Sequence, residues 1–142
     1  MQKSALRRRI TPSVPFTLKV EDADGSKFEL NFKLSYDFNA MALVEEKTGL
    51  SMMSGEVFAN PSAKKTTVLL RAGIQANNPD YAGDEGLDAI GTLLNISTAA
   101  EALLAITEAF FAALPKEKAD AIRASIKGET PAPADPTNAP SA

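Results

Sequence analysis

Alternation of apolar and polar residues in two neighbouring segments constrains the fold more than any other feature of this chain. A two-residue period is typical of strands with one buried face, and Asp24 and Gly25 between the segments form a turn signal. We expect a β-hairpin of about residues 15–36, whose apolar face must be covered because an isolated hairpin is only marginally stable. The apolar positions are Phe16, Leu18 and Val20, then Phe28, Leu30, Phe32, Leu34 and Tyr36.

The segment after the hairpin changes to helical spacing. Asp37 or Asn39 can accept hydrogen bonds from the free N–H groups that begin a helix, and Gly49 suits the left-handed position that ends one. These signals predict a helix of about residues 39–48. A short helix of about residues 51–59 is expected to follow.

Two longer helices are predicted from their capping signals. Asn60, followed by proline, can cap a helix of about residues 61–76, since proline is well tolerated at the first helical position. Thr98 and Glu101 fit the capping box, in which each side chain bonds a backbone N–H near the other residue. They predict a helix of about residues 99–114.

Two further helical segments complete the predicted fold. Leu87, Ile90 and Leu94 share one face of a helix, and another helix is expected after Pro115, ending at Gly128. The predicted class is α+β, predominantly α, with an N-terminal β-hairpin packed on a compact bundle of five or six short helices.

The length of 142 residues is that of one domain. We expect a flexible basic arm over residues 1–12 and a single domain over residues 13–127. Its hairpin part is 15–36 and its helical part 37–127. Residues 128–142 contain four of the nine prolines and no large apolar residue, which predicts a disordered Pro/Ala-rich tail.

Composition narrows the chemistry that the chain can perform. Cysteine, histidine and tryptophan are absent, which removes disulfides, thiolate nucleophiles and the usual zinc sites. Asp22, Asp24 and Glu29 do not match a calcium loop, because glycine comes at the fourth position of that segment instead of the sixth. We predict a protein without catalytic residues, metal or cofactor, and the apolar runs are too short to predict a membrane span.

Two charged groups allow more than one interpretation. Glu45 and Glu46 are adjacent on a helix, so they diverge by about 100° and do not converge on one atom; we interpret them as a solvated or salt-bridged face, with interface chemistry at Glu45 as the alternative. The arm carries Arg7, Arg8 and Arg9, but the net charge of -3 makes nucleic acid an unlikely partner. A DNA-binding regulator that uses these arginines remains an alternative.

Three segments resemble one protein family. "DFNAMALVEEKTGLSM", "TTVLLRAGIQANNPDYAGDEGLDAIGTLL" and "AAEALLAITEAFFAAL" are similar to the tail assembly chaperones of long-tailed, siphovirus-like bacteriophages and of gene transfer agents. The resemblance covers about residues 28–114. The matching positions are Asn39, Ala40, Glu45, Thr48, Gly49, Leu69, Leu70, Ala72, Gly73, Pro79 and Glu108.

The resemblance implies a non-enzymatic protein that binds the hydrophobic tape measure protein and promotes polymerisation of the tail tube protein around it. It further implies action in the host cytoplasm during phage assembly and absence from the mature virion. Separately, we consider a homo-oligomer possible. The alternative within the same setting is a structural component of the tail, such as a tube or minor tail protein.

An apolar groove between helices could accept an amphipathic helix of such a client. We predict it near the helices of about residues 61–76 and 99–114. The candidate partner-binding residues are Leu70, Ile74, Phe110, Phe111 and Glu45, and the alternative is that the four apolar side chains belong to the core.

Overall fold

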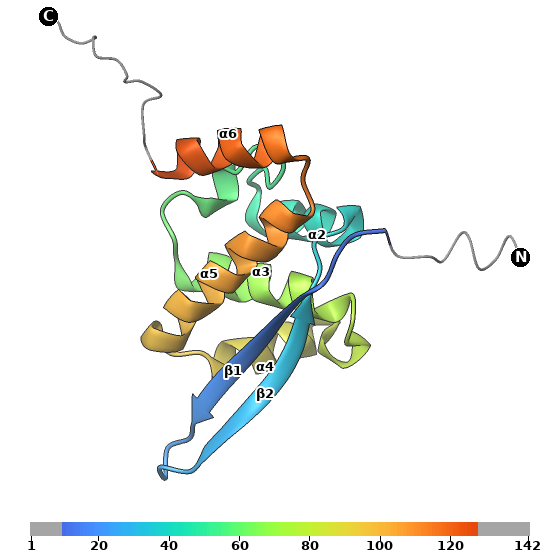
Figure 1. Cartoon of the computed structure of the whole chain (residues 1–142). Coiled ribbons are helices and arrows are strands. Elements are labelled where there is room, and N and C mark those ends of the chain that lie inside the picture. Colours follow the sequence, from blue (N-terminus) through green and yellow to red (C-terminus); the bar gives the residue numbers. More distant parts are fainter. Residues whose placement is uncertain (1–9, 128–142) are drawn as a thin grey trace, which may run out of the picture.

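Two antiparallel strands are followed by five α-helices in residues 10–127, the part of the chain that the computed structural model describes (Figure 1). The α+β class with predominantly helical content is confirmed. The predicted arm and tail lie outside the described residues, apart from residues 10–12. In chain order the elements are β1 (Val14–Glu21), β2 (Lys27–Leu34), α2 (Phe38–Thr48), the 3-10 turn η1 (Glu56–Phe58), α3 (Ala63–Gln75), the 3-10 turn η2 (Pro79–Tyr81), α4 (Gly83–Leu93), α5 (Ile96–Ala112) and α6 (Lys116–Lys127).

The hairpin buries one face, as predicted. The register of β1 and β2 places Phe16 opposite Phe32 and Leu18 opposite Leu30. Phe16, Leu18 and Phe32 are buried, whereas the residues between them are exposed or half-buried. Helix α5 packs on β1 and α3 packs on the inner end of β2, so these two helices cover the apolar face.

The hairpin tip is a turn built by its own carboxylates. The Asp22 carboxylate accepts hydrogen bonds from the N–H groups of Asp24 and Ser26, at 3.2 and 3.0 Å, and Gly25 adopts a φ of 93°, which favours glycine. Hydrogen bonding with the Asp22 carboxyl and with Ser26 lowers the pKa of Asp24 to about 2. The predicted turn is confirmed.

Helix α2 begins and ends at two of the predicted signals. The Asp37 carboxylate accepts a hydrogen bond from the Ala40 N–H at 2.9 Å and forms the N-cap, while Asn39 lies inside the helix. Gly49 ends the helix in the left-handed region, with a φ of 71°, and its N–H donates to the Glu45 carbonyl oxygen.

The short helix predicted over residues 51–59 is wrong, because only the single 3-10 turn η1 forms there. Gly55 lies in the left-handed region at a φ of 84°, which interrupts a right-handed helix. The Glu56 carboxylate accepts a hydrogen bond from the Ser51 N–H at 3.0 Å. This bond connects the two ends of the loop. It also uses the Ser51 N–H group, which is then not available for a helical hydrogen bond.

The predicted N-cap of the next helix is also wrong. Asn60 adopts a φ of 53° in the connecting turn, and Ser62 is the N-cap of α3, accepting a hydrogen bond from the Lys65 N–H at 3.1 Å. The Lys65 ammonium donates to the carbonyl oxygens of Ala59 and Asn60, at 2.8 and 3.1 Å. These bonds stabilise the turn that carries the chain past Pro61 before the helix begins.

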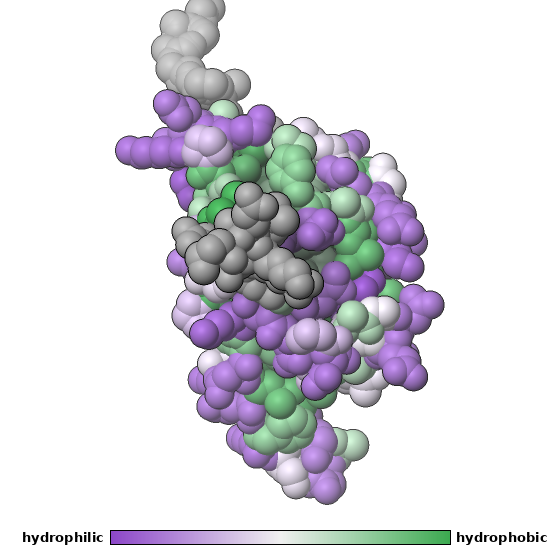
Figure 2. All heavy atoms as spheres, turned by 90° about the vertical axis from the view of Figure 1, so that its right-hand side faces the viewer, coloured by the Kyte–Doolittle hydropathy of each residue, from purple (hydrophilic) through white to green (hydrophobic). Residues whose placement is uncertain are grey.

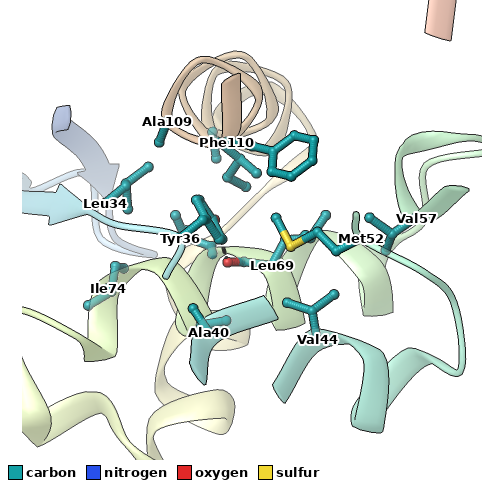
Figure 3. Close-up of a cluster of buried hydrophobic side chains, with 14 of the residues drawn as sticks. Leu34, Tyr36, Ala40, Val44, Met52, Val57, Leu69, Ile74, Ala109 and Phe110 are labelled. Atoms are coloured by element: carbon teal, nitrogen blue, oxygen red, sulfur yellow. Dashed lines mark hydrogen bonds between the residues drawn. The ribbon is translucent and has the colours of Figure 1, made fainter. Parts of the chain in front are cut away.

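Helix α3 lies at the centre of the core. The Tyr36 side chain, just after β2, donates a hydrogen bond to the Leu69 carbonyl oxygen at 2.6 Å. Figure 3 shows Tyr36 between α3 and α5, with Phe110 on the α5 side and Val44 of α2 on the opposite side. All four of these side chains are fully buried or nearly so, and they join the hairpin to three helices.

Helix α5 begins earlier than the predicted residue 99, because Asn95 and Thr98 form its capping box in place of Thr98 and Glu101. The Asn95 side chain accepts from the Thr98 N–H, and the Thr98 hydroxyl accepts from the Asn95 N–H, each at 2.9 Å. The helices predicted around Ile90 and after Pro115 are confirmed as α4 and α6. None of the helices in residues 10–127 has the length and hydropathy that crossing a membrane requires.

Candidate functional site

The four apolar residues predicted to bind a partner lie in the core of the structure. Leu70, Ile74 and Phe110 have no exposed surface, and Phe111 is 8% exposed. The guanidinium of Arg123, from α6, lies 4.3 Å from the centre of the Phe111 ring and covers it. In this conformation the side chains therefore match the core alternative and present no surface to a client.

Glu45 holds the loop after α2 in place and forms no ion pair within residues 10–127. Its Oε2 accepts a hydrogen bond from the Met52 N–H at 3.1 Å, which ties the loop after α2 back to that helix. Glu46 is exposed. Neither forms a salt bridge within residues 10–127, and Lys47 Nζ lies 3.6 Å from Asp84 Oδ1 instead. The solvated interpretation fits Glu46, whereas Glu45 has a structural contact that its position in the sequence did not reveal.

An apolar groove does lie between α3 and α5, but at the opposite end from the predicted residues. It encloses about 430 Å³ where the first turns of α3 and α5 meet the last turn of α4. Both α3 and α5 begin at the left of Figure 1. The residues that line this α3–α5 groove are Pro61, Ser62, Ala63, Thr66, Thr67, Gly91, Leu94, Asn95, Ile96, Ala99, Ala100 and Leu103.

Small residues form much of the groove, and larger apolar residues stand at its edge. A Cβ at Gly91 would lie 3.6 Å from the Thr67 methyl carbon, so α4 and α3 approach closely there. Ile96, the first residue of α5 after the Asn95 cap, is 93% exposed although it is a large apolar residue. An exposed isoleucine beside an apolar hollow is a favourable contact for an apolar side chain of another molecule.

The hydroxyl groups of the groove are already bonded to the backbone of α3. The Thr66 hydroxyl donates to the Ser62 carbonyl oxygen at 2.7 Å, and the Thr67 hydroxyl donates to the Ala63 carbonyl oxygen at 2.8 Å. The Ser62 hydroxyl accepts from the Lys65 N–H as the N-cap. The groove thus offers mainly apolar contact, which suits the apolar face of a helix better than a polar small molecule.

No protein-family model matches the chain, and neither curated proteins nor solved structures give a significant match.

Other exposed apolar side chains are scattered over the surface. Phe28 on the hairpin, Phe38 at the start of α2 and Met53 in the following loop are 43%, 71% and 43% exposed. Figure 2 shows the face at the right of Figure 1, where hydrophilic residues dominate and apolar surface emerges in patches between them. Single apolar residues of this kind are ordinary on protein surfaces and do not mark a site by themselves.

The sequence contained a signal for the true start of α5. Asn is among the strongest N-cap residues, and a helix that begins after Asn95 places Thr98, Ala102 and Ile106 on its buried face. Ile96 and Leu103 then fall beside that face and remain partly or fully exposed. The prediction missed this because the Thr98 and Glu101 pair was given the capping role.

Proposed function

We propose that this protein is a non-enzymatic tail assembly chaperone of the kind made by long-tailed bacteriophages and gene transfer agents. Its client is the tape measure protein, and the α3–α5 groove receives an amphipathic helix of that client. In this role it keeps the client from aggregating while tail tube subunits polymerise around it, acts in the host cytoplasm and is left out of the mature virion.

The groove is the observation that carries the proposal. A tape measure protein is rich in long helices that expose apolar faces before assembly, and the helix-in-groove mode buries such a face. The groove has the required apolar lining, and Ile96 at its edge has almost no contact within the described chain. The groove lies between the first turns of α3 and α5, so a client helix bound there would contact both helices.

The residues that carry the sequence resemblance support the same proposal in a different way. Gly49 ends α2 in the left-handed region, and Gly73 lets the Tyr36 ring lie against α3. Leu69 provides the carbonyl oxygen that accepts the Tyr36 hydrogen bond. These three matching positions thus help to hold α2, α3 and the hairpin together, which is consistent with shared architecture.

Co-expression tests the proposal directly. The tape measure gene of the same cluster is expressed with the full chain or with Ala100→Trp, which places a large side chain at an exposed position of the groove. Ala112→Trp, exposed at the other end of α5, is the matched control. We expect soluble, copurifying tape measure protein with the unaltered chain and with Ala112→Trp, and a marked loss with Ala100→Trp.

Two results would count against the proposal. If the tape measure protein is insoluble with the unaltered chain and no complex copurifies, the chaperone function is wrong. If both tryptophan variants keep the client soluble equally well, the groove is not the client site. Mass spectrometry of purified virions provides a further test, because a stoichiometric amount of this protein there would favour a structural tail component.

A further inference from the structure

The α3–α5 groove continues into a second hollow on the other side of α3. This hollow encloses about 520 Å³ and is lined by Lys47, Ala63, Lys64, Thr67, Val68, Leu87 and Gly91. Ala63, Thr67 and Gly91 line both hollows. We call these three residues, whose side chains are small or absent, the saddle between the two hollows.

The two hollows differ in charge. The α3–α5 groove has no charged residue in its lining, whereas Lys47 and Lys64 line the second, which we call the lysine hollow. Lys47 lies 3.6 Å from the largely exposed carboxylate of Asp84. Lys64 is exposed and has no carboxylate within 4 Å among residues 10–127. The lining of the lysine hollow thus includes two cations and no carboxylate, and Lys64 is the one of the two that forms no salt bridge within residues 10–127.

We propose that the occupant of the groove is an amphipathic helix with acidic residues beside its apolar face. This inference rests on the proposed function and adds a chemical requirement to it. The apolar side chains of the helix fill the α3–α5 groove, its backbone crosses the saddle at Gly91, and a glutamate or aspartate meets Lys64 in the lysine hollow. Complementary charge would fix the register of the helix, whereas apolar contact alone would let it slide.

Synthetic peptides test the requirement with the full-length protein. The probes are fluorescently labelled, alanine-based helical peptides. Each carries two leucines at positions i and i+4 and two variable residues, one placed one turn before the first leucine and the other one turn after the second. The variable residues are glutamate, glutamine or lysine. Fluorescence anisotropy gives the Kd of each peptide at low and high salt.

We expect the glutamate peptide to bind about two- to fivefold more tightly than the glutamine peptide, which is the range for one exposed ion pair. The lysine peptide should bind more weakly than both, and salt should reduce the differences. Lys64→Glu should reverse the order of the glutamate and lysine peptides. Lys118→Glu, an equal charge change at an exposed site on α6, should leave the order unchanged.

The outcomes separate this inference from the proposed function. Equal binding of the glutamate and glutamine peptides, blocked by Ala100→Trp, would overturn the acidic requirement and leave the groove as a client site. A glutamate preference that survives Lys64→Glu would place the acidic contact elsewhere and also overturn it. The groove would be ruled out as a binding site if no peptide binds and the tape measure protein also remains soluble with Ala100→Trp.

Discussion

The Tyr36 ring lies directly against Gly73 of α3. A Cβ placed on Gly73 would come within 2.6 Å of the Tyr36 hydroxyl oxygen and 2.7 Å of the ring carbon that carries it. The Gly73 carbonyl oxygen also accepts a hydrogen bond from the Ser35 N–H at 3.0 Å. The end of the hairpin is thus joined to the central helix through backbone and side chain at one glycine.

Gly73→Ala should destabilise the protein, although alanine is the better helix former. In an open helix this substitution stabilises by roughly 1 kcal/mol, but here the new methyl group would overlap the fully buried Tyr36. Overpacking of this kind costs about 1–3 kcal/mol, so we expect a net decrease in the free energy of unfolding. Urea denaturation followed by circular dichroism measures it.

Gly91→Ala is the matched control for that experiment. Its Cβ would meet the Thr67 methyl carbon at 3.6 Å, an ordinary contact, and Gly91 also lies within a helix. We expect unchanged or slightly raised stability. A Gly73→Ala protein as stable as Gly91→Ala would show that Tyr36 can move away from α3 at little cost.

Tyr36 should make the fold sensitive to alkaline pH. Burial raises the pKa of the Tyr36 hydroxyl far above its ordinary value near 10, because the charged phenolate cannot be hydrated there. The unfolded chain therefore loses this proton first. The contribution of the buried Tyr36 hydroxyl to the free energy of unfolding is complete below a pH of about 10. Above that pH the free energy of unfolding falls by about 1.4 kcal/mol for each pH unit.

The alkaline prediction is measurable in a Tyr81→Phe protein, in which Tyr36 is the sole tyrosine. Phenylalanine keeps the edge-to-face contact that the Tyr81 ring makes with Phe32, at 5.4 Å between ring centres. Tyrosinate absorbance should rise only as circular dichroism reports unfolding. Titration of Tyr36 while the helices remain intact would contradict the burial argument.

Periodicity predicted those parts of the fold that depend on a repeated pattern. The alternation around Phe16 and Phe32 predicted the buried face of the hairpin, and Asp37 with Gly49 marked the ends of α2, because each signal acts over a few neighbouring residues. The helix starts at Ser62 and Asn95 were missed for a physical reason. Several polar residues competed for each cap, and the choice depends on turns and packing that involve distant residues.

The candidate site was harder to predict than the fold. Apolar spacing drew attention to Leu70 and Phe110, but the same spacing marks the core of any helical bundle. The groove instead uses small residues such as Ala63 and Gly91, which carry no signal in a hydropathy pattern. It exists only where three helix ends meet, a relationship that is set by the tertiary arrangement.

Asn95→Ala should weaken the start of α5 and with it the edge of the groove. The substitution removes the side chain that accepts the Thr98 N–H, and loss of an N-cap typically costs about 0.5–2 kcal/mol. Ser97→Ala, exposed in the same helical turn, is the control and should change stability little. Urea denaturation gives the two values, and equal stability of both variants would mean that the capping box is not needed.

Glu45→Lys should destabilise the loop after α2, whereas Glu101→Lys on α5 should not. The first substitution removes the carboxylate that accepts the Met52 N–H, at a cost of about 0.5–1.5 kcal/mol. The second changes an exposed side chain by the same charge, and such changes usually stay within about 0.5 kcal/mol. A change in client binding by Glu45→Lys without a change in stability would favour a direct interface role for Glu45.

Arg71 is a buried cation whose hydrogen-bonding capacity is only partly used. Its side chain is 2% exposed, Nη1 donates to the Gln75 Oε1 at 3.1 Å, and Nε and Nη2 have no partner in the described structure. Burial lowers the pKa of Arg71, while the charges of Asp84 and Glu46 act in the opposite direction. The Arg71 guanidinium thus lies near two carboxylates, but neither forms a salt bridge with it in the described structure.

Arg71→Met should leave the protein as stable as before or more stable. Methionine has a similar length and adapts to irregular spaces, and it removes polar atoms whose burial without partners costs about 1–3 kcal/mol. Gln75→Met, which removes the one acceptor and leaves the charge buried, should lower stability instead. Urea denaturation compares the two variants. A loss above about 2 kcal/mol in Arg71→Met would indicate that water or an anion occupies the remaining guanidinium nitrogens.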